Sequence, residues 1–436
     1  MVEFGTPYWW EDGADLPDLP NIPPKTSELT IIGAGYTGLS AAITARRAGA
    51  NVLVLDAGVP GQGASSRNGG MIGVHTRILQ QELTRSFGAN AARALLSEAP
   101  AAFAFTKGLI EQEKIDCDLQ LTGRIVLSWT KTGQNKLETV ADQMLRETDT
   151  ALQVVDRTEL CDHIYTDRYF GGIVYQDHGG LQPRKFHDGL LDIALREGVK
   201  IVQNCAVTGF KNDLKGFEIT TANGVIHTTK MIVATNGYTR KPFRWLTRRF
   251  FPLPSFIIAT EQLSKDVIAN IAPKKHMMVE TRAKHCYFRI SPDGTRIIFG
   301  GRASMVPVSP EFAAKRLRAT MVDIWPQLKD VKITHSWRGY TGFAFEQMPY
   351  VGRRDGYHFA MGYSGSGVAL APYLGMKLAY QALGDDRGKT AYSLTTPQTR
   401  WFHPGGWPYF LAAGELWYRQ VVDRLENRQS ARDREK

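Results

Sequence analysis

The sequence predicts an α/β protein, α+β overall, in which a Rossmann-like nucleotide-binding domain is joined to a second, mainly antiparallel-sheet domain. Three observations support this prediction. A glycine-rich motif near the N-terminus lies between an apolar run and a helical pattern. Between residues 241 and 335 the chain changes to short segments rich in aromatic and β-branched residues, which favour strands. From residue 357 it returns to a strand, a glycine-rich turn and a helix.

The first motif, residues 33–38, reads Gly-Ala-Gly-Tyr-Thr-Gly and has the spacing of a dinucleotide-binding βαβ unit. Gly33 permits a tight turn, Gly35 lets the backbone approach a pyrophosphate, and Gly38 lets the helix pack closely on the strand. The first N–H groups of the helix are then free to bind phosphate oxygens. Asp56 ends the next apolar run and is placed to accept hydrogen bonds from ribose hydroxyls. We therefore expect a nucleotide at this position.

The rest of the chain alternates between helical and strand patterns. Helices are expected at 79–113, 136–147, 186–197, 312–324 and from the 362–367 turn through 382. Strands are expected at 29–32, 124–129, 199–203, 206–210, 217–221, 225–228, 231–234, 255–260, 285–290, 296–299 and 358–361. The polar stretch past Asn427 is expected to be disordered.

Composition is that of an ordinary globular protein. The formal charge of +10 arises from Lys and Arg spread along the chain, so we expect a solvated basic surface that suits carboxylate substrates. The four cysteines form no C-x-x-C pair, and His285 beside Cys286 lacks further ligands at metal-site spacing, so no metal site is expected. The N-terminus lacks the pattern of a signal peptide, and no run of about eighteen apolar residues occurs. We expect a cytoplasmic protein without a membrane span.

Three further glycine-containing stretches follow the first motif, at 63–70, 234–238 and 362–368, and no second G-x-G-x-x-G occurs. With the first motif, these stretches resemble the D-amino-acid oxidase (DAO) superfamily of FAD-dependent oxidoreductases, the group containing glycine oxidase, sarcosine oxidase and γ-glutamylputrescine oxidase. The resemblance extends over nearly the whole chain. Two short strings, at 8–11 and 236–238, resemble the γ-glutamylputrescine oxidase branch more closely than glycine oxidase.

The resemblance implies which residues bind FAD. The adenylate and pyrophosphate half is assigned to Gly33, Ala34, Gly35, Tyr36, Thr37, Gly38, Asp56, Ala57 and Val207. The remaining contacts, which include those on the flavin side, are assigned to Ser65, Ser66, Arg67, Asn68, Gly69, Gly70, Met71, Thr235, Asn236, Gly237, Gly365, Ser366, Gly367, Val368 and Ala369. A simple surface loop at 65–70 and a flexible serine-glycine turn at 365–369 are the alternatives. Sarcosine oxidases attach flavin to a cysteine in the region that corresponds to 337–346, where this chain has none, so FAD is expected to be noncovalent.

The implied domain organisation is discontinuous. An N-terminal extension (1–27) and a C-terminal extension (386–436) flank an FAD-binding domain at 28–95, 152–240 and 336–385 and a substrate domain at 96–151 and 241–335.

The implied activity is FAD-dependent oxidation of a C–N bond in a small amine or amino acid, such as a secondary amine, an N-substituted amino acid or a γ-glutamyl amine. Hydride transfer to flavin N5 gives an imine that hydrolyses, and O2 or another electron acceptor reoxidises the flavin. An RNA-modifying flavoprotein of the same fold is the alternative, which the basic pI suits, although no appended RNA module is found and no nucleic-acid partner is expected. A flavin-binding protein without turnover is a third interpretation. Ser364 lacks the glycine spacing of a hydrolase nucleophile elbow.

Candidates for the substrate pocket are fewer. Tyr287 and Arg289 alternate onto one face of a strand, where a phenol and a guanidinium can hold a carboxylate; a structural Tyr and a surface Arg are the alternative. His75 follows the flavin-side loop and is a candidate to approach the ring, although a lone histidine is commonly a packing residue. Tyr340 and Glu346 are candidates to line the pocket.

Overall fold

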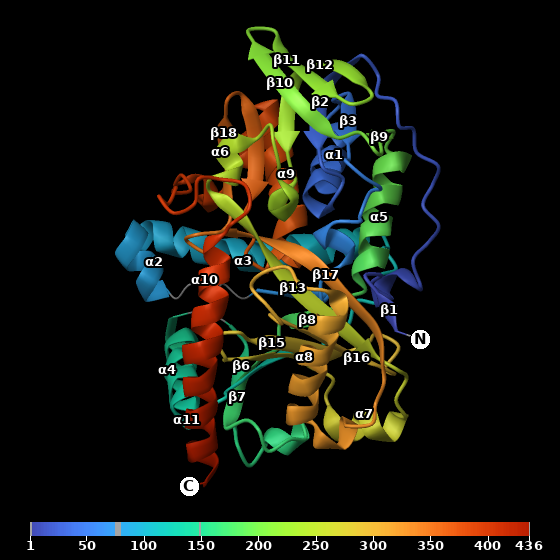
Figure 1. The fold of residues 1–436 in the computed structure, drawn as a ribbon. Helices are drawn as coiled ribbons and strands as arrows, with labels where there is room; N and C mark the ends of the chain where they lie inside the picture. Colours follow the sequence, from blue (N-terminus) through green and yellow to red (C-terminus); the bar gives the residue numbers. More distant parts are fainter. Residues whose placement is uncertain (1, 75–79, 148–149, 436) are drawn as a thin grey trace.

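The computed structural model describes residues 2–74, 80–147 and 150–435. Two large sheets divide the described chain into an upper and a lower half in Figure 1, and helices cover both. Each half has its own apolar core, one around the first sheet and α1, α5 and α9, the other around the second sheet and α8. The predicted combination of a Rossmann-like domain with a mainly antiparallel second domain is confirmed.

The first sheet has a parallel centre in the order β19, β12, β2, β3, β9. Its strands are β2 (Thr26–Ile32), β3 (Val52–Leu55), β9 (Lys200–Val202), β10 (Val207–Asp213), β11 (Gly216–Thr221), β12 (Gly224–Val233), β18 (Tyr350–Arg354) and β19 (Tyr357–Met361). The helices of this half are α1 (Tyr36–Arg47), α2 (Gln80–Phe87), α3 (Ala89–Gln112), α5 (Pro183–Arg196) and α9 (Gly367–Leu383). All four side chains of β3 are buried, as expected for a parallel strand covered on both faces.

The second sheet is antiparallel except for two parallel pairs, β1 with β17 and β14 with β5. In spatial order its strands are β1 (Glu3–Phe4), β17 (Ile333–Ala344), β13 (Phe250–Thr260), β16 (Ile297–Gly301), β15 (Cys286–Ile290), β14 (Met277–Glu280), β5 (Arg124–Leu127), β7 (Gly171–Tyr175) and β6 (Leu152–Asp156). Its helices are α4 (Lys131–Glu147), α7 (Lys265–Ile271) and α8 (Pro310–Ile324). The short helix α6 (Arg244–Thr247) lies in the upper half, where its Leu246 is part of the first core. A short pair, β4 (Met71–Gly73) with β8 (His178–Gly180), lies apart from both large sheets.

Single helical turns complete the secondary structure. They are η1 (Tyr8–Trp10), η2 (Ala64–Ser66), η3 (Leu160–Asp162), η4 (Asn236–Tyr238), η5 (Pro326–Leu328), η6 (Asp386–Gly388), η7 (Ala391–Ser393) and the π-helical η8 (Tyr418–Val422).

Strand pairing differs from the expected segment boundaries in two places. Strands β6 and β7 belong to the second sheet, although residues from 152 onward were expected in the nucleotide-binding domain. Strand β17 remains in the second sheet through Ala344, beyond the expected exchange at 336. The two strands expected at 225–228 and 231–234 are one strand, β12, because its first part pairs with β11 and its last part with β2.

The expectation of disorder past Asn427 is wrong. Helix α10 (Phe410–Trp417) and helix α11 (Asp423–Glu435) run along the lower half (Figure 1). Side-chain carboxylates hold α11 in place, because Glu426 accepts from the Ala283 N–H at 3.1 Å and Asp433 accepts from the Lys131 N–H at 2.9 Å. These partners are distant in sequence, so local polarity gave no sign of them.

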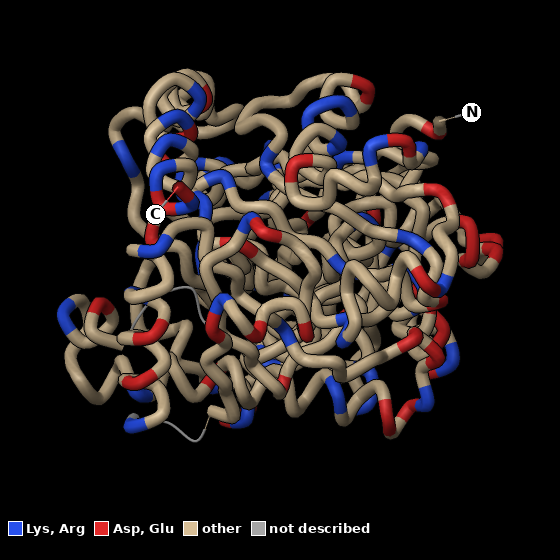
Figure 2. The backbone as a smooth tube through the Cα atoms, turned by 90° about the horizontal axis from the view of Figure 1, so that it is seen from below, with Lys and Arg blue, Asp and Glu red and all other residues tan. Residues whose placement is uncertain are grey.

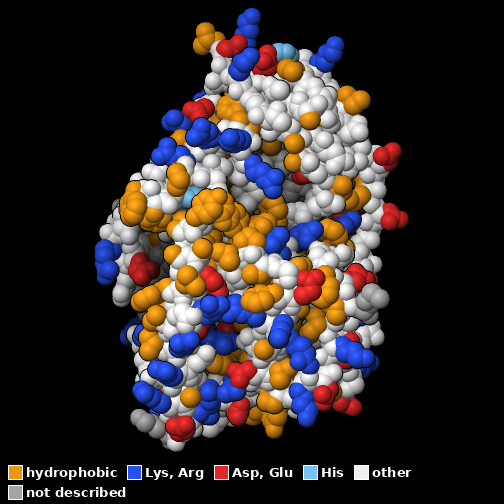
Figure 3. Space-filling view, in the orientation of Figure 1, with side chains coloured by type: hydrophobic (Ala, Val, Ile, Leu, Met, Phe, Trp, Pro, Cys, Tyr) orange, Lys and Arg blue, Asp and Glu red, His pale blue; other side chains and the backbone are white. Residues whose placement is uncertain are grey.

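Hydrophobic side chains gather across the middle of the face in Figure 3, over the segment around α10. The exposed large hydrophobic residues of the chain include Trp401, Tyr409, Leu416 and Trp417, which lie in α10 or in the segment before it. No helix in the described ranges is both long and apolar enough to cross a membrane.

Candidate functional site

The carboxyl ends of four parallel strands meet at one edge of the first sheet. The segments that follow β2, β3, β12 and β19 surround a cavity of about 900 Å³, which residues of β13, β14, β15 and β17 close from the side of the second sheet. Open α/β sheets bind ligands at this edge, and ligand pockets have volumes of roughly 300–1,000 Å³. The cavity therefore has the position and size of a site for a large ligand.

The first glycine motif forms a tight turn from β2 into α1. Gly33 adopts a φ of +103°, which side chains other than glycine rarely allow. A Cβ atom on Gly38 would overlap the carbonyl oxygen of Gly33, so only glycine lets α1 pack this closely on the turn. The N-cap of α1 is Gly35, which has no side chain to bond the first N–H groups. The helix consequently presents its N-terminus to the cavity.

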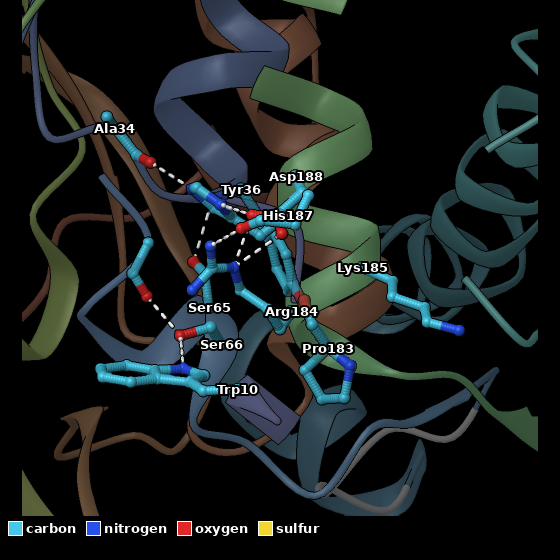
Figure 4. A network of polar contacts seen from close by, with 12 residues as sticks. Trp10, Ala34, Tyr36, Ser65, Ser66, Pro183, Arg184, Lys185, His187 and Asp188 are labelled. Atoms are coloured by element: carbon cyan, nitrogen blue, oxygen red, sulfur yellow. Dashed lines mark hydrogen bonds and ion pairs between the residues drawn. The ribbon is translucent and has the colours of Figure 1, made fainter. Parts of the chain in front are cut away.

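Helix α5 supports this turn from behind, as Figure 4 shows. The Nε2 atom of the buried His187 lies 2.8 Å from the Ala34 carbonyl oxygen and donates to it, because a carbonyl is only an acceptor. The Tyr36 hydroxyl donates to the Pro183 carbonyl oxygen at 2.9 Å. Arg184 pairs with Asp188 at 2.7 Å one turn further along α5. No sequence pattern indicates this support, because its residues lie about 150 positions beyond the motif.

Asp56 follows β3 at the rim of the cavity. Its carboxylate accepts from the Ala34 N–H at 2.8 Å and from the Gly58 N–H at 3.0 Å. Burial raises the pKa of Asp56, and the two N–H groups oppose that shift. The carboxylate lies among the lining residues, where the expected contact to a ribose would require it.

The loop at 65–71 is held in one shape by its own polar groups. The Asn68 side chain accepts from the Gly70 N–H at 2.7 Å and donates to the Ser65 carbonyl oxygen at 2.9 Å. Ser66 is buried and donates to the Gly61 carbonyl oxygen at 2.6 Å. The alternative of a simple surface loop does not describe this segment, since most of it lines the cavity.

Two tryptophans of the N-terminal segment bind the same loop. Trp9 Nε1 donates to the Asn68 carbonyl oxygen and Trp10 Nε1 to the Ser66 hydroxyl, both at 2.8 Å. The Arg67 guanidinium lies 4.6 Å from the centre of the Trp10 ring and donates to the Gly5 carbonyl oxygen at 3.1 Å. Residues before the first sheet therefore form part of the support of the site.

Helix α9 brings a second helix N-terminus to the cavity. Its N-cap, Ser366, makes no side-chain capping bond, and Gly365 through Ala369 line the cavity. Tyr363 joins this end to the first motif, since its hydroxyl lies 2.6 Å from the Thr37 hydroxyl. This contact fixes the start of α9 next to the first motif.

Most residues assigned to FAD line the cavity. Those that do so are Gly33, Gly35, Tyr36, Thr37, Asp56, Ala57, Ser65, Arg67, Asn68, Gly69, Met71, Val207, Thr235, Asn236, Gly365, Ser366, Gly367, Val368 and Ala369. The other assigned residues, which are outside the described lining, are Ala34, Gly38, Ser66, Gly70 and Gly237. Gly237 packs against β17, where a Cβ atom would lie 2.9 Å from the Gly342 nitrogen.

Tyr287 and Arg289 do not act together in this structure, although both lie on β15. Tyr287 lines the cavity, and its hydroxyl lies 2.8 Å from the Ser255 hydroxyl. Burial raises the pKa of Tyr287 to about 12, so the phenol keeps its proton at neutral pH. Arg289 is buried outside the described lining and donates to the carbonyl oxygens of Gly70 at 3.2 Å and Leu181 at 2.9 Å. It braces the 65–71 loop.

A different arginine, Arg302, faces the cavity directly after β16. Burial lowers its pKa, while Tyr418 and Tyr287 oppose that shift. Its guanidinium lies 5.3 Å from the centre of the Phe343 ring. The sequence pattern does not single out Arg302. The alternation of side chains between the two faces of a strand assigns residues within the strand, and Arg302 lies just after its end.

Some of the remaining candidates for the substrate pocket line the cavity and others do not. Tyr340 lines the cavity, whereas Glu346 lies 3.3 Å from Arg400 in an ion pair outside the described lining. His285 also lines the cavity. His75 lies outside the described residues.

The charge of the lining is uneven. Among the described residues, Arg67, Arg124, Arg240, Lys241 and Arg302 line the cavity, and Asp56 is the acidic residue beside them. Such a lining attracts anions.

Comparisons with known proteins agree with this geometry. A family model described as FAD dependent oxidoreductase (DAO) matches residues 28–381. A probable oxidoreductase OrdL of Rhizobium meliloti is 31% identical over 384 residues, covering 86% of this chain and 88% of that protein. The gamma-glutamylputrescine oxidoreductase of Escherichia coli is 29% identical, covering 92% of this chain and 93% of that protein. The glycine oxidase structure from Geobacillus kaustophilus covers 85% of this chain and 99% of its own with a TM-score of 0.71 at 18% identity, which shows a shared fold.

The close contact at Gly38 predicts the effect of one added methyl group. Gly38→Ala should destabilise the protein by at least about 1–3 kcal/mol, because the overlap with the Gly33 carbonyl forces α1 away from the turn. Thermal unfolding measures this loss. Gly108→Ala is the matched control, since its Cβ would meet nothing closer than 3.9 Å in α3; that helix should gain up to about 1 kcal/mol. Equal stability of the two variants would contradict the packing argument.

The position of Arg289 predicts a structural role. Arg289→Met removes the buried donor of the Leu181 carbonyl, whereas the Gly70 carbonyl still accepts from the Leu181 N–H at 2.8 Å, so stability should fall by about 1–3 kcal/mol. Denaturant unfolding measures the change. An unchanged stability combined with a large loss of substrate affinity would instead assign Arg289 to the pocket.

Proposed function

The chain belongs to the DAO family of FAD dependent oxidoreductases, and from that premise we propose that it oxidises a carbon–nitrogen bond in a small amine or amino acid. Candidate substrates are secondary amines, N-substituted amino acids and γ-glutamyl amines that carry a carboxylate. Molecular oxygen or an electron-transfer partner completes turnover. The relatives named for γ-glutamylputrescine and glycine support this class of substrate.

The residues around the cavity fit FAD. Gly33 and Gly35 bring the backbone to the cavity and Gly38 lets α1 pack on the turn, so the start of α1 lies where a pyrophosphate would bind, and its N–H groups and helix dipole favour negative charge there. Its first N–H, that of Tyr36, donates to the Ser65 hydroxyl at 3.0 Å. The start of α9 offers a second set of N–H groups. Asp56 is the acceptor suited to ribose hydroxyls.

FAD, when bound, supplies a hydride acceptor for a carbon that bears nitrogen. The protein's task is to hold the substrate against that acceptor and to exclude water. Tyr287 and Ser255 form a hydroxyl pair on the substrate side of the cavity, and the raised pKa keeps Tyr287 a hydrogen-bond donor. No side chain of the chain needs to act as a nucleophile.

The position of Arg302 in the cavity is the observation that supports a substrate with a carboxylate. Arg302 lines the cavity near Tyr287, and within the described part of the chain no carboxylate is recorded as its ion-pair partner. A guanidinium binds a carboxylate through two parallel hydrogen bonds. We assign it to the substrate carboxylate, with the Tyr287 hydroxyl as a further donor.

The alternative of an RNA-modifying flavoprotein has less support. In Figure 2, Lys and Arg are interspersed with Asp and Glu over the face that is shown. RNA recognition favours a basic stripe or patch. A small anionic substrate in an electropositive cavity suits the chain better, and we propose a cytoplasmic location for it.

Noncovalent binding of FAD predicts that the cofactor leaves on denaturation. Acid or heat precipitation of the yellow protein should leave the colour in the supernatant, because residues 337–346 contain no cysteine for attachment. Absorbance of supernatant and pellet is the measurement. Colour retained in the washed pellet would contradict noncovalent binding.

The assignment of Arg302 predicts weaker binding of simple carboxylates. Arg302→Gln should raise the dissociation constant of acetate at least about tenfold, since a charged hydrogen bond contributes about 1.5–3 kcal/mol. Perturbation of the flavin spectrum by acetate measures this. Arg302→Lys should lie between, and Arg353→Gln, an exposed residue of β18 with the same loss of charge, should match the wild type. Equal affinities in all four proteins would remove Arg302 from the substrate site.

A further inference from the structure

The N-terminal segment, residues 3–11, is fastened to the second sheet and to the loop at 65–71. Strand β1 pairs with β17 in the second sheet, and the register sets Glu3 opposite His335. Turn η1 follows, and its tryptophans bond to Ser66 and Asn68. At both ends of the segment a glutamate points to the same histidine, because Glu3 and Glu11 each place a carboxylate oxygen beside His335.

We propose that Glu3, Glu11 and His335 form a binding site for one divalent transition-metal ion such as Zn²⁺, which fastens the N-terminal segment to β17. The ligand set is one imidazole nitrogen and two carboxylate oxygens, with water in the remaining position. Mixed nitrogen and oxygen ligands of this kind suit Zn²⁺ better than Mg²⁺ or Ca²⁺, which prefer oxygen alone. Sequence spacing gave no sign of the site, since His335 follows Glu11 by 324 positions.

The spacing of the ligand atoms fits tetrahedral coordination. His335 Nε2 lies 3.2 Å from a Glu11 oxygen and 3.5 Å from a Glu3 oxygen. Bonds of ~2.1 Å to a tetrahedral Zn²⁺ separate neighbouring ligand atoms by about 3.4 Å. All three ligand atoms lie within 4.8 Å of one another.

The hydrogen bonds around His335 indicate that Nε2 carries a lone pair. The Thr334 hydroxyl donates to a carbonyl oxygen, that of Thr260 at 3.2 Å or that of Ala259 at 3.3 Å. With its hydrogen used in this way it accepts from His335 Nδ1, 3.0 Å away, which places the hydrogen of a neutral imidazole on Nδ1. A histidine that binds a metal usually donates its other N–H in this way.

The lone pair then faces two carboxylates, an arrangement that a bound cation stabilises. The His335 side chain is 3% exposed, and Nε2 has no hydrogen-bond partner among the described residues. A bound metal ion satisfies Nε2 and both carboxylates together, whereas a proton on Nε2 would form no hydrogen bond of good geometry here.

The ion would connect the N-terminal segment to the cofactor site. Trp9 and Trp10 hold the backbone and side chains of residues 66–68, and Trp337 of β17 donates to the Arg67 carbonyl oxygen at 2.9 Å. Fixing both ends of the segment removes motions that loosen this loop. Metal binding should therefore slow the release of FAD.

Calorimetric titration of the untagged, chelator-treated holoenzyme with ZnCl₂ tests the site. The wild type should bind one Zn²⁺ per chain, and Glu11→Gln and Glu3→Gln should each weaken binding at least about tenfold. Asp12→Asn removes the same charge beside Glu11 and should bind as the wild type does. His335→Gln is a third variant, whose thermal unfolding first establishes that it folds. Absence of one-to-one binding in the wild type, or equal weakening in Asp12→Asn, would overturn the proposal.

The rate of FAD release provides a second measurement that does not depend on turnover. The fluorescence of free FAD should rise severalfold more slowly in ZnCl₂ than in chelator for the wild type and for Asp12→Asn, and equally fast for Glu11→Gln. If Zn²⁺ binds but leaves the release rate unchanged, the connection to the cofactor loop is overturned.

Discussion

Two helices, α1 and α9, begin at the edge of one cavity, and neither is capped by its own N-cap side chain. The first N–H groups of a helix need acceptors, and the helix dipole adds partial positive charge at the same point. Bringing both helix ends to one cavity depends on glycines that permit backbone contact at Gly38 and a left-handed turn at Gly33. The cationic side chains of the lining increase the same preference for anions. The rest of the site is arranged around this requirement.

The part of the site that is local in sequence was predictable. The first motif can be recognised in the sequence because its glycines, the preceding strand and Asp56 fall within one βαβ unit. The stretches at 65–71 and 365–369 were found through their resemblance to a family, and the cavity brings most of them together. Alternating patterns also separated the two sheets, although the pairing of β6, β7 and β17 shifted the points of exchange.

The part that depends on tertiary contacts was not predictable. His187 and Arg289 act on backbone carbonyls far away in sequence, and no periodic pattern marks such a partner. Arg289 shares a strand face with Tyr287, yet it binds the Gly70 and Leu181 carbonyls while Tyr287 faces the cavity. Arg302 lies at the cavity because it follows β16, which pairs with β15. Helix α11 is held in place by Glu426 and Asp433, whose carboxylates accept from the backbone N–H groups of Ala283 and Lys131. Amino-acid composition cannot indicate such tertiary contacts.

The central claim is that this cavity holds FAD and presents it to a carboxylate-bearing amine. An anaerobic titration of the yellow holoenzyme with matched pairs of amines, each pair differing only in a carboxylate, tests it most directly. The account predicts that at least one carboxylate-bearing amine bleaches the visible flavin absorbance and that its partner without the carboxylate does so far more slowly. If every amine leaves the spectrum unchanged while dithionite still bleaches it, the claim is contradicted.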